Sequence, residues 1–122
     1  YGVQVGTTSF NAIETIIQPT KQARVYDSND AAVEALKKKQ VDGIVVDLPT
    51  ADFISNVELD GGVIVGQLAQ GQPEHFSAVL AKGSTLTPCV NTAIKTLTDD
   101  GTLTALASKW LPFQNSVPTF SQ

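Results

Sequence analysis

The feature that most constrains the fold is a regular alternation between short apolar runs and segments with helical periodicity. Runs typical of buried strands occupy residues 3–5, 23–26, 41–46 and 63–68. Between these runs, apolar residues recur at helical spacing, and residues that start or stop helices flank the segments. The resulting order, β-α-β-α-β-α-β, predicts a parallel α/β sheet whose crossover connections are right-handed.

Three helices are expected in the connections between these strands. Pro19 ends the first helix, Ser28 or Asn29 caps the second, and Pro49 opens the third. Their apolar faces comprise Phe10, Ile13, Ile16 and Ile17 in the first, Ala32, Val33 and Leu36 in the second, and Ala51, Phe53, Ile54 and Val57 in the third.

The pattern changes after the fourth run, where residues 70–74 form the one expected linker. A strand over residues 76–81 and two helices are predicted to follow, and the tail 114–122 is expected to be loosely held. The predicted domains are therefore 1–73 and 74–122. The apolar stripes of the last two helices are Val90, Ala93, Ile94 and Leu97, then Leu103, Leu106, Ala107, Trp110 and Leu111. The expected fold class is α/β, a parallel-rich sheet flanked by helices and followed by a strand and two helices.

Composition narrows the range of partners. The chain has 122 residues, of which 42% are hydrophobic and 16% charged, as in a globular domain. A net charge of −4 argues against a nucleic-acid partner. The single cysteine, Cys89, excludes an internal disulfide and a multi-cysteine metal site, and we expect it to be buried. We expect no cofactor and no metal, and no apolar run approaches the ~20 residues of a membrane span.

Two polar groups follow predicted strands and are the candidate site. Gly6, Thr7, Thr8 and Ser9 follow the first strand and offer hydrogen-bond donors to an anion. Asp47 ends the third strand. If these two strands are neighbours, both groups face one crevice outside the carboxyl ends of the strands. Donors beside a carboxylate suit a zwitterion, and the sequence therefore predicts that the ligand is a free α-amino acid.

Each group also has a purely structural interpretation. The hydroxyl cluster can cap the first helix, and Asn11 with Glu14 can form a capping box. Asp47 can cap the helix that begins near Pro49. An enzyme is disfavoured because Asp47 has no carboxylate or histidine companion for acid–base chemistry.

Three segments closely resemble the polar amino-acid-binding extracellular solute-binding proteins, the capture subunits of bacterial ABC importers. The segments occur in the family's order and are Gly2-Val3-Gln4-Val5-Gly6-Thr7-Thr8-Ser9, Val41-Asp42-Gly43-Ile44-Val45-Val46-Asp47-Leu48-Pro49-Thr50-Ala51 and Val90-Asn91…Asp100-Gly101-Thr102-Leu103…Lys109-Trp110-Leu111. The resemblance implies the type II periplasmic-binding-protein fold, in which two lobes joined by a two-strand hinge clamp the ligand.

The same resemblance implies roles, partners and a location. Thr8 would bind the ligand carboxylate through its backbone N–H and hydroxyl, and Asp47 would hold the α-ammonium. The implied protein partner is the membrane permease of an importer. The implied location is periplasmic or extracellular, with the full-length parent free or anchored as a lipoprotein. The alternative is a ligand-sensing domain of a receptor or sensor kinase, and a few dehydratases also resemble this fold.

Against this family, the chain looks like a fragment. Residues 1–73 correspond to lobe two and residues 74–122 to the C-terminal return into lobe one, whereas the arginine and most aromatic walls that relatives supply from lobe one have no counterpart. We therefore expect amino-acid binding in the millimolar range. We also expect a homodimer that exchanges the C-terminal segment, because the apolar helix stripes would otherwise be left bare.

Overall fold

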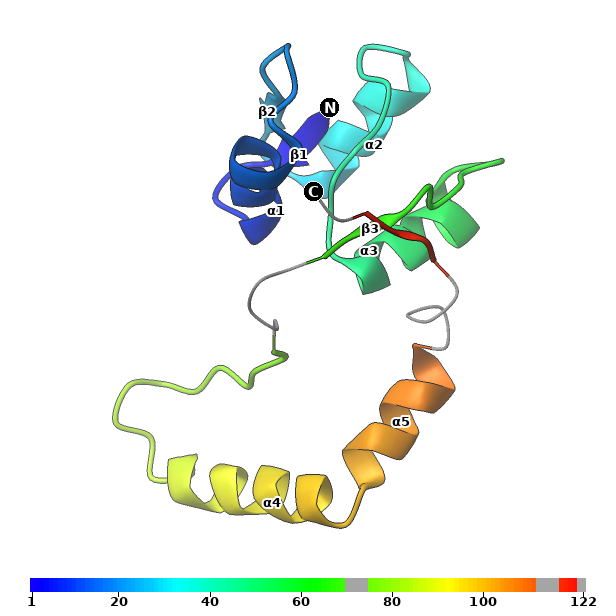
Figure 1. Ribbon diagram of the computed structural model, residues 1–122. Helices are drawn as coiled ribbons and strands as arrows, with labels where there is room; N and C mark the ends of the chain where they lie inside the picture. The colour runs from blue at the N-terminus through cyan, green and yellow to red at the C-terminus, as the bar shows by residue number, and fades with distance from the viewer. Residues whose placement is uncertain (70–74, 112–116, 121–122) are drawn as a thin grey trace. The chain divides into compact units, whose positions relative to one another are not determined.

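The computed structural model describes residues 1–69, 75–111 and 117–120 (Figure 1). Over these residues the structure is mixed α/β, with five α-helices and two pairs of short parallel strands. The described residues fall into two compact units. The first unit comprises 1–69 and 117–120, and the second comprises 75–111.

The first sheet is built around β1 (Gly2–Gln4), which pairs in parallel with β2 (Arg24–Tyr26). The connection between them is helical: α1 (Thr8–Ala12) continues into a π-helical turn, η1 (Ile13–Ile17). This helical segment ends before Pro19, as the sequence predicts. Parallel pairing of the first two strands is therefore confirmed.

The segment 41–46 runs beside β1 but is not the regular strand that the sequence predicts. One parallel bridge joins Gly2 to Ile44. The Gly2 N–H donates to the Gly43 carbonyl at 2.8 Å, and the Val45 N–H donates to the Gly2 carbonyl at 3.1 Å. The first and third predicted strands are therefore neighbours, which is the condition for the two polar groups that follow them to face one crevice. Among the described residues β1 is the middle member, with β2 on one side and the segment 41–46 on the other.

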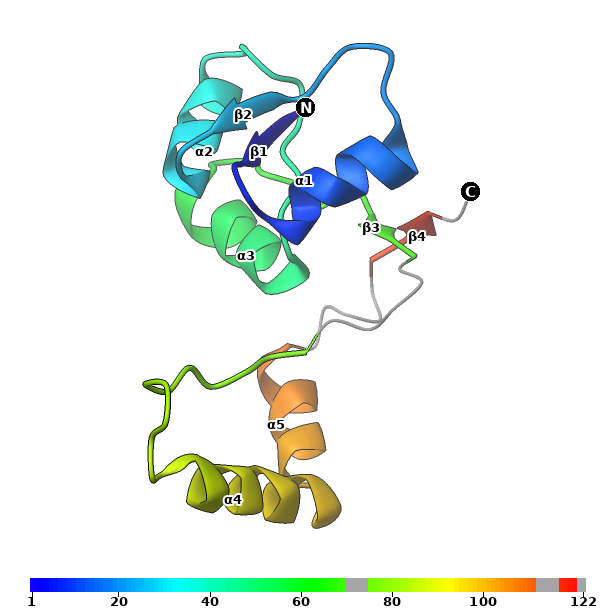
Figure 2. The same ribbon diagram turned by 90° about the vertical axis from the view of Figure 1, so that its left-hand side faces the viewer.

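Two further helices start directly after β2 and after the segment 41–46. α2 (Asn29–Lys37) is capped by Ser28, whose hydroxyl accepts a hydrogen bond from the Ala31 N–H at 3.2 Å. α3 (Leu48–Phe53) continues into a second π-helical turn, η2 (Ile54–Glu58). In both views α1 and α2 lie on opposite sides of β1 and β2, as two crossovers of the same hand do when they run in opposite directions across the sheet (Figures 1 and 2).

The hydrophobic core belongs to the first unit, where α1 packs on β1 and α2 packs on both strands. Leu36 is half-buried rather than buried. Phe53 and Val57 are 53% and 67% exposed, so the apolar face predicted for the third helix is buried only in part. The buried apolar residues are Val3, Ile13, Ala32, Val33, Ala35, Val41 and Ile54.

The C-terminal residues of the described chain form a second parallel pair. β4 (Thr119–Phe120) lies beside β3 (Gln67–Leu68), and the Gln67 N–H donates to the Pro118 carbonyl at 2.8 Å. The prediction of a loosely held tail over 114–122 is therefore wrong for residues 117–120, and its other residues lie outside the described chain. Strand pairing across a long sequence separation is invisible to local patterns.

The predicted strand 63–68 is reduced to its last two residues. Val63 and Val65 are 77% and 76% exposed, because nothing pairs with this part of the chain among the described residues. Gly66 permits the pairing that does form: a Cβ at this position would overlap the Phe120 ring. A side chain at Gly66 would thus displace Phe120 from β3.

The C-terminal strand also changes the expected division of the chain. The sequence separates 1–73 from 74–122, whereas the structure groups 117–120 with 1–69 because β4 pairs with β3. The predicted linker 70–74 lies outside the described residues.

The second unit consists of two helices, α4 (Thr87–Asp99) and α5 (Thr102–Trp110), which contact each other. Gly101, at φ +78°, makes the turn between them. The predicted strand 76–81 is wrong: these residues have no regular structure, and Val79 is 95% exposed. A short apolar run becomes a strand only when a partner satisfies its backbone, and the described residues supply none.

None of the described residues of the second unit is buried. Cys89 is exposed at the start of α4, so its predicted burial is wrong. Within the described part of the second unit α4 packs on α5, and Cys89 lies on the part of its surface that stays open.

Candidate functional site

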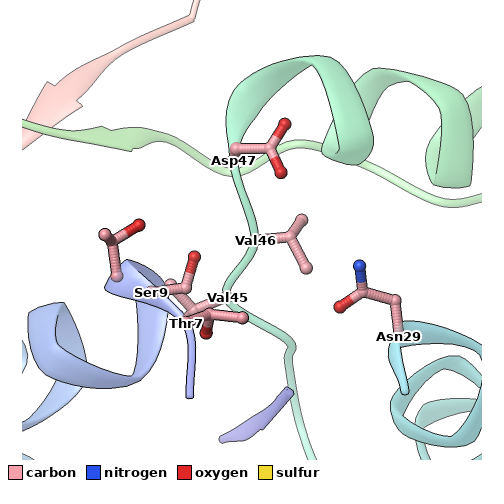
Figure 3. A pocket seen from close by; sticks show the side chains of 7 residues that line it. Thr7, Ser9, Asn29, Val45, Val46 and Asp47 are labelled. Carbon is pink, nitrogen blue, oxygen red and sulfur yellow. The ribbon is translucent and has the colours of Figure 1, made fainter. Parts of the chain in front are cut away.

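Three helices of the first unit begin at the same edge of its sheet. α1 follows β1, α2 follows β2, and α3 follows the segment 41–46 that runs parallel to β1. The carboxyl ends of parallel strands meet at one edge, which is where ligands bind in open α/β sheets. A pocket of about 240 Å³ lies at this edge (Figure 3). It is lined by Thr7, Thr8, Ser9, Asn29, Val45, Val46 and Asp47.

The predicted site residues are thus brought together, with one exception. Gly6 does not line the pocket. It turns the chain from β1 into α1 at φ +70°, a conformation that favours glycine. A Cβ there would meet nothing within 4 Å, so the requirement is conformational and not steric. The role of Gly6 is to orient the hydroxyl residues that follow it.

Thr7 is the N-cap of α1. Its hydroxyl accepts a hydrogen bond from the Phe10 N–H at 3.2 Å and donates to the Gln4 carbonyl at 2.9 Å. The capping interpretation is therefore confirmed for Thr7. The capping box of Asn11 and Glu14 is wrong, because both residues lie inside the helical segment.

Thr8 and Ser9 are differently placed. They are the first two residues of α1, whose backbone N–H groups have no partner within a helix. Among residues 1–69, 75–111 and 117–120, neither hydroxyl makes a hydrogen bond. Thr8 is exposed and Ser9 is half-buried. These two residues together offer two N–H donors and two hydroxyls to a ligand in the pocket.

Asp47 is the N-cap of α3. Its Oδ1 accepts from the Thr50 N–H at 3.0 Å, and its Oδ2 accepts from the Thr50 hydroxyl at 2.7 Å. The capping interpretation of Asp47 is therefore confirmed as well. A carboxylate offers about four lone-pair positions, so capping leaves acceptor capacity for a cation. Asp47 is exposed and lies on a different side of the pocket from Ser9 (Figure 3).

The sequence reasoning missed Asn29 as a pocket residue. The sequence predicts this residue only as a possible cap, whereas Ser28 caps α2 and Asn29 lines the pocket. A signal was available, because each junction between a strand and the next helix contributes to the same edge of a parallel sheet. Val45 and Val46 supply the apolar part of the lining.

The pocket lining carries one formal charge, that of Asp47. No group of three His, Cys, Asp or Glu side chains in the described chain is placed to hold a metal ion. His75 belongs to the second unit and is exposed. None of the described helices is both long and apolar enough to cross a membrane.

No protein-family model matches the chain, and the searches of curated proteins and of solved structures found no match either. The resemblance to solute-binding proteins therefore rests on the three sequence segments quoted above.

Proposed function

We propose that the chain binds a free polar amino acid, without chemical conversion, in the pocket at the edge of the first sheet. The observation that carries the proposal is that Thr8 and Ser9 line the same pocket as Asp47, with Ser9 and Asp47 on different sides of it (Figure 3). One wall offers donors for a carboxylate and the other offers a carboxylate for an ammonium. These are the two charged groups that every free α-amino acid presents.

The donor wall suits a carboxylate for a local reason. The N–H groups of Thr8 and Ser9 point out of the first turn of the helical segment, and the neighbouring hydroxyls add further donors. Hydrogen bonds to an ionised acceptor are roughly twice as strong as those between neutral groups. Thr7 lines the pocket but adds no donor to this wall, because its hydroxyl already donates to the Gln4 carbonyl and accepts from the Phe10 N–H.

The acidic wall suits an ammonium. Thr50 holds both oxygens of Asp47 in fixed positions, so little side-chain freedom is left to lose when a cation binds. Because Asp47 is exposed, solvent screens the ion pair, and its contribution is smaller than that of a buried pair. We therefore expect a dissociation constant on the order of 1 mM, which corresponds to about −4 kcal/mol.

The proposal includes the biological setting implied by the sequence resemblance. The chain would be part of the solute-binding protein of an ABC importer with the type II periplasmic-binding-protein fold. It would act outside the cytoplasm and deliver its amino acid to a membrane permease. The division of the chain supports this: unit one comprises residues before 70 and residues after 116, so the chain passes between the two units twice, as in a protein with two lobes joined by two connections.

Titration of the isotope-labelled chain with polar amino acids, followed by amide NMR, tests the proposal. We expect saturable shifts at Thr8, Ser9 and Asp47. The matched controls are the Nα-acetyl and α-amide derivatives of the same amino acid, each of which lacks one of the two charges and should bind more weakly. If both derivatives bound as tightly as the unmodified amino acid, or if no saturable shift appeared at these residues, the proposal would be refuted.

A further inference from the structure

We infer that the pocket selects an amino acid whose side chain is neutral and forms hydrogen bonds, and that Asn29 is the residue that recognises this side chain. The inference rests on the proposed function and adds the class of ligand. It follows from the position of Asn29, from the charge of the pocket and from its size.

Asn29 is available for a ligand because α2 does not need its side chain. Ser28 caps the helix, and the amide of Asn29 makes no hydrogen bond to any residue of the described chain. Asn29 is half-buried and enters the pocket from α2, on a side that neither Asp47 nor Ser9 occupies (Figure 3). An amide both donates and accepts, so it pairs best with another amide or a hydroxyl.

The charge of the lining excludes charged side chains. Asp47 carries the one negative charge of the pocket, and the ligand's α-ammonium neutralises it. A lysine or arginine ligand would need a second carboxylate, and a glutamate or aspartate ligand would need a cation. Neither kind of group lines the pocket. Placing an unpaired charge against Asn29 and the two valines would weaken binding.

The size of the pocket and the apolar part of its lining also fit an amino acid with a neutral side chain that forms hydrogen bonds. Val45 and Val46 provide a surface for one or two methylene groups between the α-carbon and the polar end of a side chain. The volume of about 240 Å³ lies below the ~300–1,000 Å³ of pockets for larger ligands. Glutamine and asparagine combine a short methylene stem with a terminal amide, and they are the probes of choice.

Four ligands separate the possibilities when titrated into the labelled chain: L-glutamine, L-glutamate, L-lysine and L-leucine. We expect L-glutamine to bind about tenfold more tightly than the other three, the effect of about one or two additional hydrogen bonds. Asn29→Ala should reduce this preference to about twofold or less. Asn91→Ala, which removes an exposed amide on α4 of the second unit, should leave it unchanged.

Asn29→Asp provides the sharpest variant. It keeps the shape of the side chain and places a carboxylate in the first turn of α2, where negative charge is favourable, so folding is retained. We expect this variant to prefer L-lysine to L-glutamine. An unaltered preference in Asn29→Asp and Asn29→Ala would overturn the role of Asn29 while leaving amino-acid binding intact. If no amino acid produces saturable shifts at the pocket, the proposed function fails and this inference fails with it.

Discussion

The carboxylate of Asp47 accepts two hydrogen bonds from one residue, Thr50, through the backbone N–H at 3.0 Å and through the hydroxyl at 2.7 Å. This arrangement makes Asp47 both the cap of α3 and the one charged group of the pocket. Capping needs only an oxygen acceptor, whereas holding an ammonium needs the negative charge. The two roles can therefore be separated by substitution.

Asp47→Asn should weaken amino-acid binding about tenfold and leave the fold intact. Asparagine caps helices about as well as aspartate, so we expect the free energy of unfolding to change by less than about 0.5 kcal/mol. Loss of the charge removes the partner of the ammonium and should raise a dissociation constant on the order of 1 mM by about tenfold. NMR titration and chemical denaturation measure the two effects independently.

Asp47→Ala is the matched comparison, because it removes the cap together with the charge. It should lose binding and also about 1 kcal/mol of stability. If Asp47→Asn bound amino acids as tightly as the parent chain does, capping would be the sole role of Asp47.

Thr8 offers a way to test the donor wall without disturbing the helix. Thr8 is the first residue of α1, a position that tolerates proline, and Thr7 before it is extended at φ −97° and ψ 159°, as a residue preceding proline should be. Thr8→Pro should therefore fold, lose both the N–H and the hydroxyl, and fail to bind. Thr8→Ala keeps the N–H and should weaken binding by about 1 kcal/mol.

Thr7→Ala is the control for this pair of variants. Thr7 caps α1, so its removal should cost about 1 kcal/mol of stability and change affinity little. If Thr8→Pro and Thr8→Ala had equal and small effects on affinity, the carboxylate of the ligand would not bind at Thr8.

The helices of this chain could be predicted from its sequence because their signals are local. Ser28 and Asp47 cap helices that begin where the sequence places them, and Gly101 turns α4 into α5. Each of these signals acts within one turn of chain, so no knowledge of tertiary contacts is needed.

The strands were harder to predict because a strand depends on its partner. The runs 41–46, 63–68 and 76–81 have similar apolar content, yet the first forms one bridge, the second pairs over two residues and the third has no partner among the described residues. The pairing of β3 with β4 joins residues about fifty positions apart. In the candidate site, Thr8, Ser9 and Asp47 follow predicted strands and are therefore predicted as site residues, whereas the sequence predicts Asn29 only as a possible cap.

The ionisation of Asp100 makes the stability of the start of α5 depend on pH. Hydrogen bonds from the Thr102 side chain and from its backbone N–H, the latter at 2.9 Å, lower the pKa of the Asp100 carboxyl below its ordinary value of 3.8. A depressed pKa means that the ionised form stabilises the folded state. This contribution is present above pH ~3.8 and is lost as the pH falls through the lowered value.

We therefore expect the α5 amide signals, followed by NMR, to change on acidification only below pH ~3.8. Thr102→Ala removes the larger cause of the shift, so the carbon-detected pKa of Asp100 should move back towards 3.8 in this variant. A pKa that does not respond to Thr102→Ala would contradict the assignment.

The exposed apolar residues of the second unit predict that the chain associates with a second copy of itself. None of its described residues is buried, and its apolar stripes remain open: Leu97, Leu106 and Trp110 are 38%, 45% and 67% exposed. Two short helices without a core are not stable alone, and contiguous apolar surface of this kind drives association. The molar mass from light scattering should therefore rise from monomer towards dimer as the concentration increases.

Leu106→Glu tests this prediction on the stripe itself. A charge at this position would be buried without a partner in the dimer, so the variant should remain monomeric at concentrations at which the parent chain associates. Val57→Glu is the matched control, because Val57 is a similarly exposed aliphatic residue of the first unit, at 67%. If both variants lower the molar mass equally, association does not run through α4 and α5. A parent chain that stays monomeric at all concentrations would show that the two helices need no second copy.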